Sequence, residues 1–191
     1  DTVSPSSPVF DECMRSHHDR ETHQSSPFLI TDLKAACLIF SSEFLSTASS
    51  NSSPRHFEGC KVLEVGSLNI NGSVRDFFSG CQYTGLDVGP GPGVDEVGYG
   101  ENYGSPANHF DMVISCEAME HNPGWRNTWL NMLRMLKGDG LMLMTCATLG
   151  RRQHGTDNFQ PNDSPLTIGL GQSYYQNLSE SDFLSLLNPQ A

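Results

Sequence analysis

The chain has 191 residues, a formal net charge of −11 and a pI near 4.9. This length fits one domain with a sizeable core, and the strong negative charge argues against nucleic acid as a partner. No apolar run approaches the roughly 20 residues that cross a bilayer, and no secretory signal is visible. We therefore expect a cytoplasmic protein that has no contact with membranes.

Residues 1–25 are polar and rich in Ser, Pro and His, which predicts an irregular arm. His17, His18 and His23 have the composition of a metal cluster but lack the spacing that would aim them at one point, so we expect no metal. Reduced, buried thiols are expected for the six cysteines because they form no C-x-x-C pair: Cys13, Cys37, Cys60, Cys81, Cys116 and Cys146.

A helical repeat follows the arm. Leu29, Leu33, Cys37, Phe40 and Phe44 recur at intervals of three or four, which predicts one apolar face of a helix. We therefore divide the chain into residues 1–56, an arm plus an amphipathic helix that packs on the core, and a main domain over 57–191.

The main domain alternates predicted strands with predicted helices. Helices are expected over 71–78, from Asn122-Pro123 to Gly138, and over 179–187, where Ser179 and Asp182 resemble a capping box. Short apolar runs predict the strands 61–65, 84–88, 94–97, 110–116 and 140–145. Such alternation indicates an α/β, Rossmann-like, doubly wound and mostly parallel sheet.

Two strand ends carry the main functional signal. The first strand runs into Glu64-Val65-Gly66 and the second ends at Asp87, which lies 87 − 66 = 21 positions after Gly66. That interval fits a βαβ unit, in which Gly66 lets backbone approach a ligand and Asp87 accepts hydrogen bonds from ribose hydroxyls. The sequence therefore predicts an adenosine-containing cofactor.

These residues resemble the class I S-adenosylmethionine-dependent methyltransferases over about residues 57–150. Glu64-Val65-Gly66 is similar to the family's first motif, Asp87 to its ribose-binding acid, and Leu136–Leu141 to its Leu-Lys-Pro-Gly-Gly segment. The resemblance implies S-adenosyl-L-methionine as cofactor, with Cys116 and Glu117 bordering it after the fourth strand. Val88, Tyr99 and Glu101 are expected near the adenine ring, although Tyr99 can equally serve packing alone.

The first motif departs from the family pattern. Leu68 and Ile70 occupy two glycine positions of Gly-x-Gly-x-Gly, so polar side chains from Ser67, Asn69 or Asn71 are expected to hold the carboxylate and amine of the cofactor, with Gly72 beside them. The segment Asn-Gly-Ser-Val-Arg resembles a small bacterial and phage branch. The sequence ends after the predicted helix over 179–187, where the family adds a strand hairpin. We therefore expect a shorter sheet, a truncated sequence or another element over the fifth strand's edge, and an uncovered edge would favour a homodimer.

Two histidines are candidates for catalysis. His121 follows the fourth strand, four positions after Glu117, and His154 lies in the loop expected over 149–173; either could accept a proton from an acceptor hydroxyl. Each also has a purely structural interpretation, in which His121 packs the turn before Asn122.

The predicted function is methyl transfer to O or N of a small-molecule or carbohydrate acceptor. The alternatives are a non-catalytic S-adenosylmethionine-binding module or partner subunit, and a nucleotide-dependent oxidoreductase. The acidic Glu64 and Asp87 and the absence of G-x-G-x-x-G argue against the oxidoreductase, because both carboxylates would repel a pyrophosphate.

Overall fold

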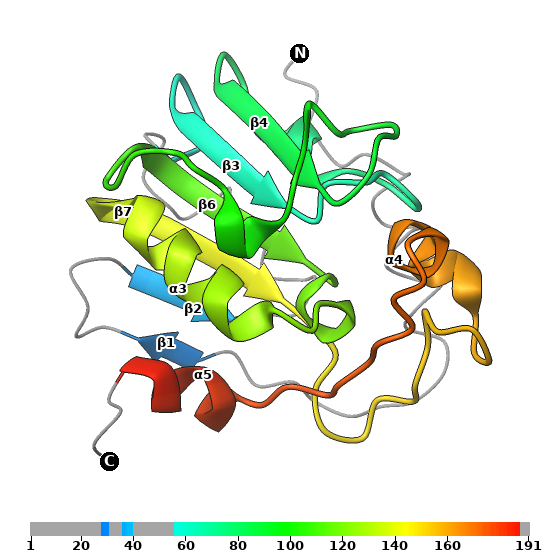
Figure 1. The fold of residues 1–191 in the computed structure, drawn as a ribbon. Helices are drawn as coiled ribbons and strands as arrows, with labels where there is room; N and C mark the ends of the chain where they lie inside the picture. The colour runs from blue at the N-terminus through cyan, green and yellow to red at the C-terminus, as the bar shows by residue number, and fades with distance from the viewer. Residues whose placement is uncertain (1–27, 31–35, 40–55, 188–191) are drawn as a thin grey trace, which may run out of the picture.

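The structure is a computed structural model that describes residues 28–30, 36–39 and 56–187. Its centre is a seven-stranded sheet in the order β1-β2-β7-β6-β3-β4-β5 (Figure 1). The strands are β1 (Phe28–Ile30), β2 (Ala36–Ile39), β3 (Lys61–Val65), β4 (Gln82–Asp87), β5 (Glu96–Val97), β6 (Phe110–Cys116) and β7 (Leu136–Thr145).

The five predicted strands of the main domain are all present and run parallel to one another in this sheet. β4 and then β5 are added on one side of β3, after which the chain returns to place β6 on the other side, followed by β7. The strand order thus reverses between β3 and β6. In open α/β sheets, ligands bind beyond the carboxyl ends of the strands at such a reversal.

The predicted N-terminal helix is wrong where the structure describes it. Residues 28–30 and 36–39 are strands; β2 pairs in parallel with β7, and β1 pairs antiparallel with β2. The apolar run Ala36–Ile39 suits a buried strand as well as a helix, and the open edge of β7 supplies the backbone partners. Part of the segment 1–56 therefore extends the main sheet, while the arm over 1–25 lies outside the described residues.

This pairing also settles what covers β7. The sequence left open whether the edge of the fifth predicted strand is free, and so available to a homodimer partner, or is covered by another element of the chain. Residues 36–39 of the same chain occupy the edge, with Ala36 opposite Leu141 and Ile39 opposite Met144. The edge of β7 is thus unavailable to a second copy, and the argument for a homodimer from an open edge does not hold.

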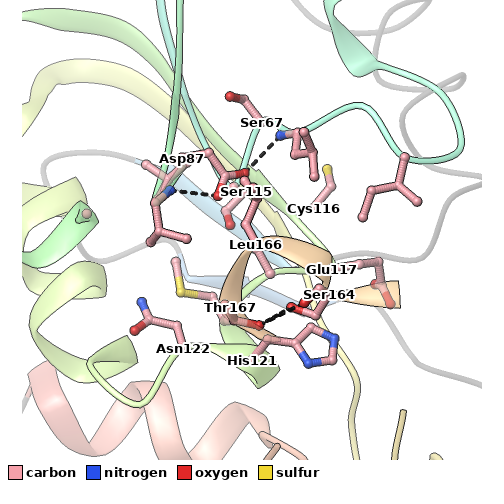
Figure 2. Close-up of a pocket in the computed structure, with 18 of the residues that line it drawn as sticks. Ser67, Asp87, Ser115, Cys116, Glu117, His121, Asn122, Ser164, Leu166 and Thr167 are labelled. Atoms are coloured by element: carbon pink, nitrogen blue, oxygen red, sulfur yellow. Dashed lines mark hydrogen bonds between the residues drawn. The ribbon is translucent and has the colours of Figure 1, made fainter. Parts of the chain in front are cut away.

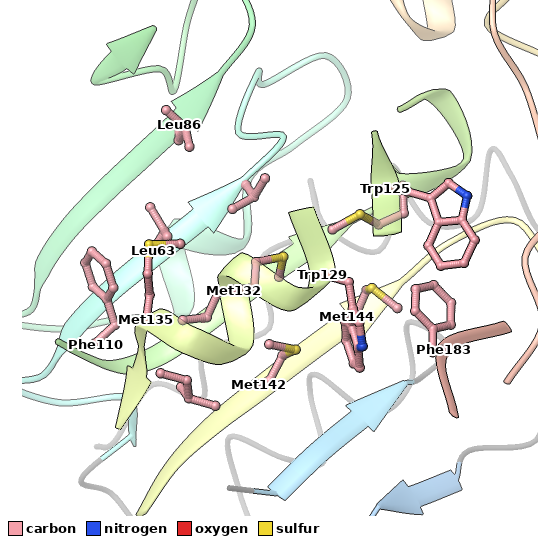
Figure 3. Close-up of a cluster of buried hydrophobic side chains, with 14 of the residues drawn as sticks. Leu63, Leu86, Phe110, Trp125, Trp129, Met132, Met135, Met142, Met144 and Phe183 are labelled. Atoms are coloured by element: carbon pink, nitrogen blue, oxygen red, sulfur yellow. The ribbon is translucent and has the colours of Figure 1, made fainter. Parts of the chain in front are cut away.

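One face of the sheet is covered by two helices, α3 (Trp125–Met135) and α5 (Glu180–Leu187). Trp125 and Trp129 of α3 are fully buried against Phe183 of α5, with ring centroids 5.1 and 5.0 Å from it (Figure 3). Asp182 accepts a 2.8 Å hydrogen bond from the Ser179 N–H, as the predicted capping box requires. This contact fixes the start of α5.

The opposite face has its own core. Val62 of β3 and Met112 of β6 belong to this second core. They pack with Phe57 and with Val74 of η2 (Val74–Phe77). The helix predicted over 71–78 is thus a single 3₁₀ turn, which Ser73 caps by accepting a hydrogen bond from the Arg75 N–H. Within the described ranges, no helix is both long and apolar enough to cross a bilayer.

Candidate active site

A cavity of about 270 Å³ lies at the carboxyl ends of β3, β4, β6 and β7. Its position is the strand-order reversal, where α/β sheets bind ligands. With the exception of Asn69, the predicted cofactor-binding and catalytic residues line this one cavity: Glu64, Gly66, Ser67, Asn71, Gly72, Asp87, Val88, Tyr99, Glu101, Cys116, Glu117, His121 and His154. Asn69 instead accepts a 2.8 Å hydrogen bond from the Gly72 N–H. The chain thus brings together residues that lie up to 90 positions apart.

The turn after β3 depends on Gly66. Its φ of +83° is a left-handed conformation that favours glycine, and a Cβ at this position would lie 2.3 Å from Cβ of Ala118. The N–H groups of Gly66 and Ser67 both donate to the Leu86 carbonyl, at 2.9 and 3.2 Å. The glycine therefore lets the turns after β3 and β6 meet.

The two missing glycines of the first motif have a local explanation. Leu68 lies against Gly91, where a Cβ would be 2.3 Å from Leu68 Cδ1. The turn after β4 therefore supplies the space that the turn after β3 does not. Ile70 is exposed and also borders the cavity.

The Asp87 carboxylate is held by two backbone groups (Figure 2). Oδ2 accepts a 2.9 Å hydrogen bond from the Leu68 N–H, and Oδ1 accepts one of 2.7 Å from the Val88 N–H. Burial raises the pKa of Asp87, and these two hydrogen bonds oppose that rise. Both oxygens are fixed at the cavity wall, with lone pairs left for a ligand.

Glu64 is the second carboxylate of the cavity, and it is only 5% exposed. Its Oε2 accepts a 2.9 Å hydrogen bond from the Tyr83 hydroxyl on β4. Burial raises the pKa of Glu64 to about 7, although the Tyr83 hydrogen bond and the nearby charge of Arg75 act to lower it. Its charge therefore changes near neutral pH.

Glu101 is positioned by the start of α3. Thr128 donates a 3.1 Å hydrogen bond to Glu101 Oε2 and accepts one of 2.8 Å from the Asn122 amide. Tyr99, on the same side of the cavity, is 39% exposed and accepts a 3.3 Å hydrogen bond from Gln172. The sequence did not indicate Thr128. Its polar role on an apolar helix face becomes visible only once α3 is placed beside the 3₁₀ turn η3 (Gly100–Asn102), which contains Glu101.

The segment after β6 is not the helical turn that Glu117 and His121 needed to share a face. Glu117 has a left-handed φ of +51°, and only Met119–His121 form a 3₁₀ turn, η4. Cys116 lies at the cavity wall, where burial raises its pKa. Glu117 lies 3.9 Å from Arg151, measured between Oε2 and Nη1.

His121 and His154 meet although 33 positions separate them. Their ring centroids are 4.9 Å apart and nearly perpendicular, and the ring of Tyr175 lies 4.9 Å from His154. Gly155 permits this contact, because a Cβ there would lie 2.5 Å from Cε1 of His121. Burial lowers the pKa of both imidazoles, that of His121 to about 4, so both are neutral at pH 7.

Glu120 lies behind the two histidines and was not indicated by the sequence. It is completely buried, and its Oε1 accepts a 3.0 Å hydrogen bond from the Ala147 N–H. Burial and the neighbouring Glu117 raise its pKa. The acidic residue directly before His121 was the available signal, but a carboxylate in sequence normally predicts a solvated position.

The predicted loop over 149–173 contains two short helical elements, η5 (Pro161–Asp163) and α4 (Pro165–Gly169). Figure 1 shows α4 beyond the arrowheads of β3, β6 and β7. Ser164, Leu166 and Thr167 line the cavity from this side, and the Ser164 and Thr167 hydroxyls are 2.6 Å apart. Ser164-Pro165 is a sequence signal for this helix start, and the prediction of a loop over the whole of 149–173 did not include it.

Sequence comparison finds no matching family model and no matching curated protein. Solved structures do match. The YcgJ protein from Bacillus subtilis superimposes with a TM-score of 0.52 at 17% identity, over 77% of this chain and 67% of that protein. A candidate sarcosine dimethylglycine methyltransferase from Galdieria sulphuraria gives 0.52 at 18% identity, over 78% and 61%.

A third similar structure contains ligands. Phosphoethanolamine N-methyltransferase 2 from Haemonchus contortus, in complex with phosphomonomethylethanolamine and S-adenosylhomocysteine, gives a TM-score of 0.52 at 17% identity. The superposition covers 77% of this chain but only 36% of that enzyme. The parallel sheet, its strand-order reversal and these superpositions agree: the chain has the fold of the class I S-adenosylmethionine-dependent methyltransferases.

Proposed function

We propose that the protein binds S-adenosyl-L-methionine and transfers its methyl group to O or N of a small-molecule or carbohydrate acceptor. One observation carries this proposal: Glu64 and Asp87, at the ends of adjacent parallel strands, line the same cavity. A cofactor with a cationic amine at one end and ribose hydroxyls near the other matches this pair of carboxylates.

Unpaired polar atoms in the cavity wall favour a polar ligand. Among the described residues, the Oγ atoms of Ser67 and Ser115 are buried without a hydrogen-bond partner, and both residues line the cavity. A buried hydroxyl that lacks a partner costs about 1–3 kcal/mol, which a bound polar group would recover. A cavity of about 270 Å³ is near the lower end of small-molecule sites, at about 300 Å³.

Charge separates this proposal from the oxidoreductase. The wall near β3 and β4 presents Glu64 and Asp87, and a dinucleotide would place its negative pyrophosphate beside them. Bound S-adenosylmethionine supplies an activated methyl group on a sulfonium. The chain then has to hold donor and acceptor in line and exclude water, which are the tasks of Asp87, Glu64 and the α4 segment.

The acceptor is assigned to the end of the cavity that His121 and His154 line. Figure 2 shows Asp87 and His121 at opposite ends of the labelled residues. A neutral imidazole can accept the proton of a hydroxyl acceptor, whereas an amine that is already neutral needs no base.

A second candidate is a module that holds the cofactor without turnover. It is favoured by Leu68 and Ile70, which stand where the family motif has glycines, and by the two backbone hydrogen bonds that Asp87 already accepts. Incubation with methyl-labelled cofactor and a panel of glycans, amines and hydroxylated metabolites separates the two. An enzyme releases S-adenosylhomocysteine with one or more acceptors, and a module binds the cofactor without releasing it.

A further inference from the structure

Three buried side chains converge beside the cavity in a way that methyl transfer alone does not require. Glu120, His121 and His154 each place a donor atom within 4.8 Å of the other two. They are 0%, 4% and 6% exposed. Two imidazoles and one carboxylate are a common donor set for divalent transition metals such as Zn²⁺ and Fe²⁺.

Two atoms of these side chains that could bind a metal lack a hydrogen-bond partner in the described part of the chain. They are Oε2 of Glu120 and Nδ1 of His121, and both atoms are buried. Buried polar atoms in native proteins are nearly always paired, so each unpaired one needs an explanation. A cation between them would pair both at once.

The remaining contacts orient the donors. His154 uses Nδ1 to contact the Arg152 carbonyl at 3.0 Å, which leaves Nε2 free, 4.0 Å from Oε1 of Glu120. The Ala147 N–H fixes Oε1 of Glu120, and a hydrogen bond to the Tyr174 main chain holds the His121 ring. Metal-binding histidines usually have their second nitrogen held in this way.

We propose that Glu120, His121 and His154 form a binding site for one divalent transition-metal ion. Donor atoms on a tetrahedral ion with bonds of about 2.0 Å lie about 3.3 Å apart, whereas the donor atoms of these three residues lie within 4.8 Å of one another, so the site needs a closure of up to about 1.5 Å. Side-chain rotation is enough for such a shift. The sequence predicted no metal, and the histidines that suggested one by composition, His17, His18 and His23, lie outside the described residues.

The nearby charges tolerate a cation. Glu117 and Arg151 lie 3.9 Å apart and offset one another, so the Glu120 carboxylate gives the neighbourhood a net negative charge once it is ionised. The positive charge of the Arg151 guanidinium therefore does not prevent a divalent ion from binding here.

The position of the site suggests what the ion would do. His121 and His154 line the cavity whereas Glu120 lies behind them, so open coordination positions would face the acceptor end. If the proposed methyl transfer holds, a hydroxyl acceptor bound there would have its pKa lowered by the ion, and its proton would pass to water. The binding site itself does not depend on that function.

The test is Co²⁺ and Zn²⁺ binding to the full chain after treatment with a chelator. We expect one equivalent of Co²⁺ to produce visible absorption bands that Zn²⁺ abolishes, and X-ray absorption of the Zn²⁺ form to indicate two imidazole ligands. Glu120→Gln and His154→Asn should each raise the Kd for Zn²⁺ by at least about 100-fold. His109→Asn is the control for a histidine elsewhere, and joint replacement of His17, His18 and His23 by Asn excludes binding at the arm; both should leave the Kd unchanged.

Unchanged Zn²⁺ affinity in Glu120→Gln and His154→Asn would overturn the site, and so would a wild-type protein that binds no ion. Should a variant fail to fold, the wild-type stoichiometry and X-ray absorption still decide. Cofactor titrations on the same samples keep the two proposals apart. Cofactor binding without metal binding defeats the metal site alone, whereas metal binding without cofactor binding defeats the proposed function alone.

Discussion

The Tyr83 hydroxyl donates a 2.9 Å hydrogen bond to Oε2 of Glu64, joining the adjacent parallel strands β4 and β3 at the cavity wall. Burial of Glu64 would favour its neutral form, and the Tyr83 hydrogen bond favours its charged form. The balance holds its pKa at about 7. The negative charge of Glu64, which would attract a cationic ligand, is therefore gained or lost near physiological pH.

Cofactor affinity should therefore depend on pH. Below pH 7 Glu64 is mostly protonated, so binding a cationic amine there requires loss of a proton, and affinity should fall by up to tenfold per pH unit. Titration calorimetry from about pH 5 to about pH 9 measures this. Glu64→Gln should bind weakly with a flatter profile. Tyr83→Phe should move the midpoint upward, because it removes a hydrogen bond that stabilises the carboxylate; an unmoved midpoint would contradict this assignment.

Stability should respond to the same group in the opposite direction. The pKa of Glu64 is raised from 4.5 to about 7 on folding, so its contribution to stability is fully present below pH 4.5 and is lost as pH rises through 7. The free energy of unfolding of wild type relative to Glu64→Gln should therefore decrease across this window. Urea denaturation at several pH values checks it, and a relative stability that rises with pH would count against a buried Glu64.

Gly66→Ala should disrupt the turn after β3. The new Cβ would lie 2.3 Å from Ala118, in a backbone with φ of +83°, and the positive φ alone costs about 1–3 kcal/mol. We expect lower stability in urea together with weakened cofactor binding. Gly104→Ala is the matched control, because nothing lies within 4 Å of its Cβ. Equal effects of the two substitutions would refute this explanation of Gly66.

The sequence predicted the central sheet well because its strands are short apolar runs that end in polar residues. Phe110–Cys116 agrees with β6 to the residue, and Glu64 and Asp87 do line one cavity. Strand-end residues are predictable since parallel strands bring their carboxyl ends to the same edge.

The errors arose where distant partners decide the local structure. Residues 36–39 carry a helical spacing, yet they pair with β7, and the sequence does not show which edge is open. Glu120 was not singled out from the sequence, although it lies beside Ala147 and two histidines. Such contacts depend on the final chain path, which periodicity does not encode.

Thr128 should affect the affinity for the cofactor by holding Glu101 in place. Thr128→Val removes the hydroxyl that donates to Glu101 and accepts from Asn122, leaving both without that partner. A buried polar group that loses its partner costs about 1–3 kcal/mol. We therefore expect the Kd for the cofactor to rise by about tenfold, with a smaller effect on stability. Thr128→Ser keeps the hydroxyl and should bind almost normally. Equal losses in the two variants would point to the methyl group instead.

The contact between α3 and α5 should dominate the stability of this face. Trp129 is fully buried against Phe183, and truncating such a side chain costs about 3–5 kcal/mol. Trp129→Ala should therefore unfold at much lower urea concentration. Leu130→Ala, on the exposed side of the same helix, should change stability by less than about 0.5 kcal/mol. Similar losses for the two would contradict the described packing.

The most direct test is calorimetric titration of the wild-type protein and Asp87→Ala with S-adenosyl-L-methionine. Wild type should bind one equivalent with a Kd of about 1–100 μM, and Asp87→Ala should bind at least about 30-fold more weakly. Asp157→Ala, an exposed acid away from the cavity wall, should match wild type. Absence of heat in the wild-type titration, or equal affinity in Asp87→Ala, would contradict the claim that these strand ends form a cofactor site.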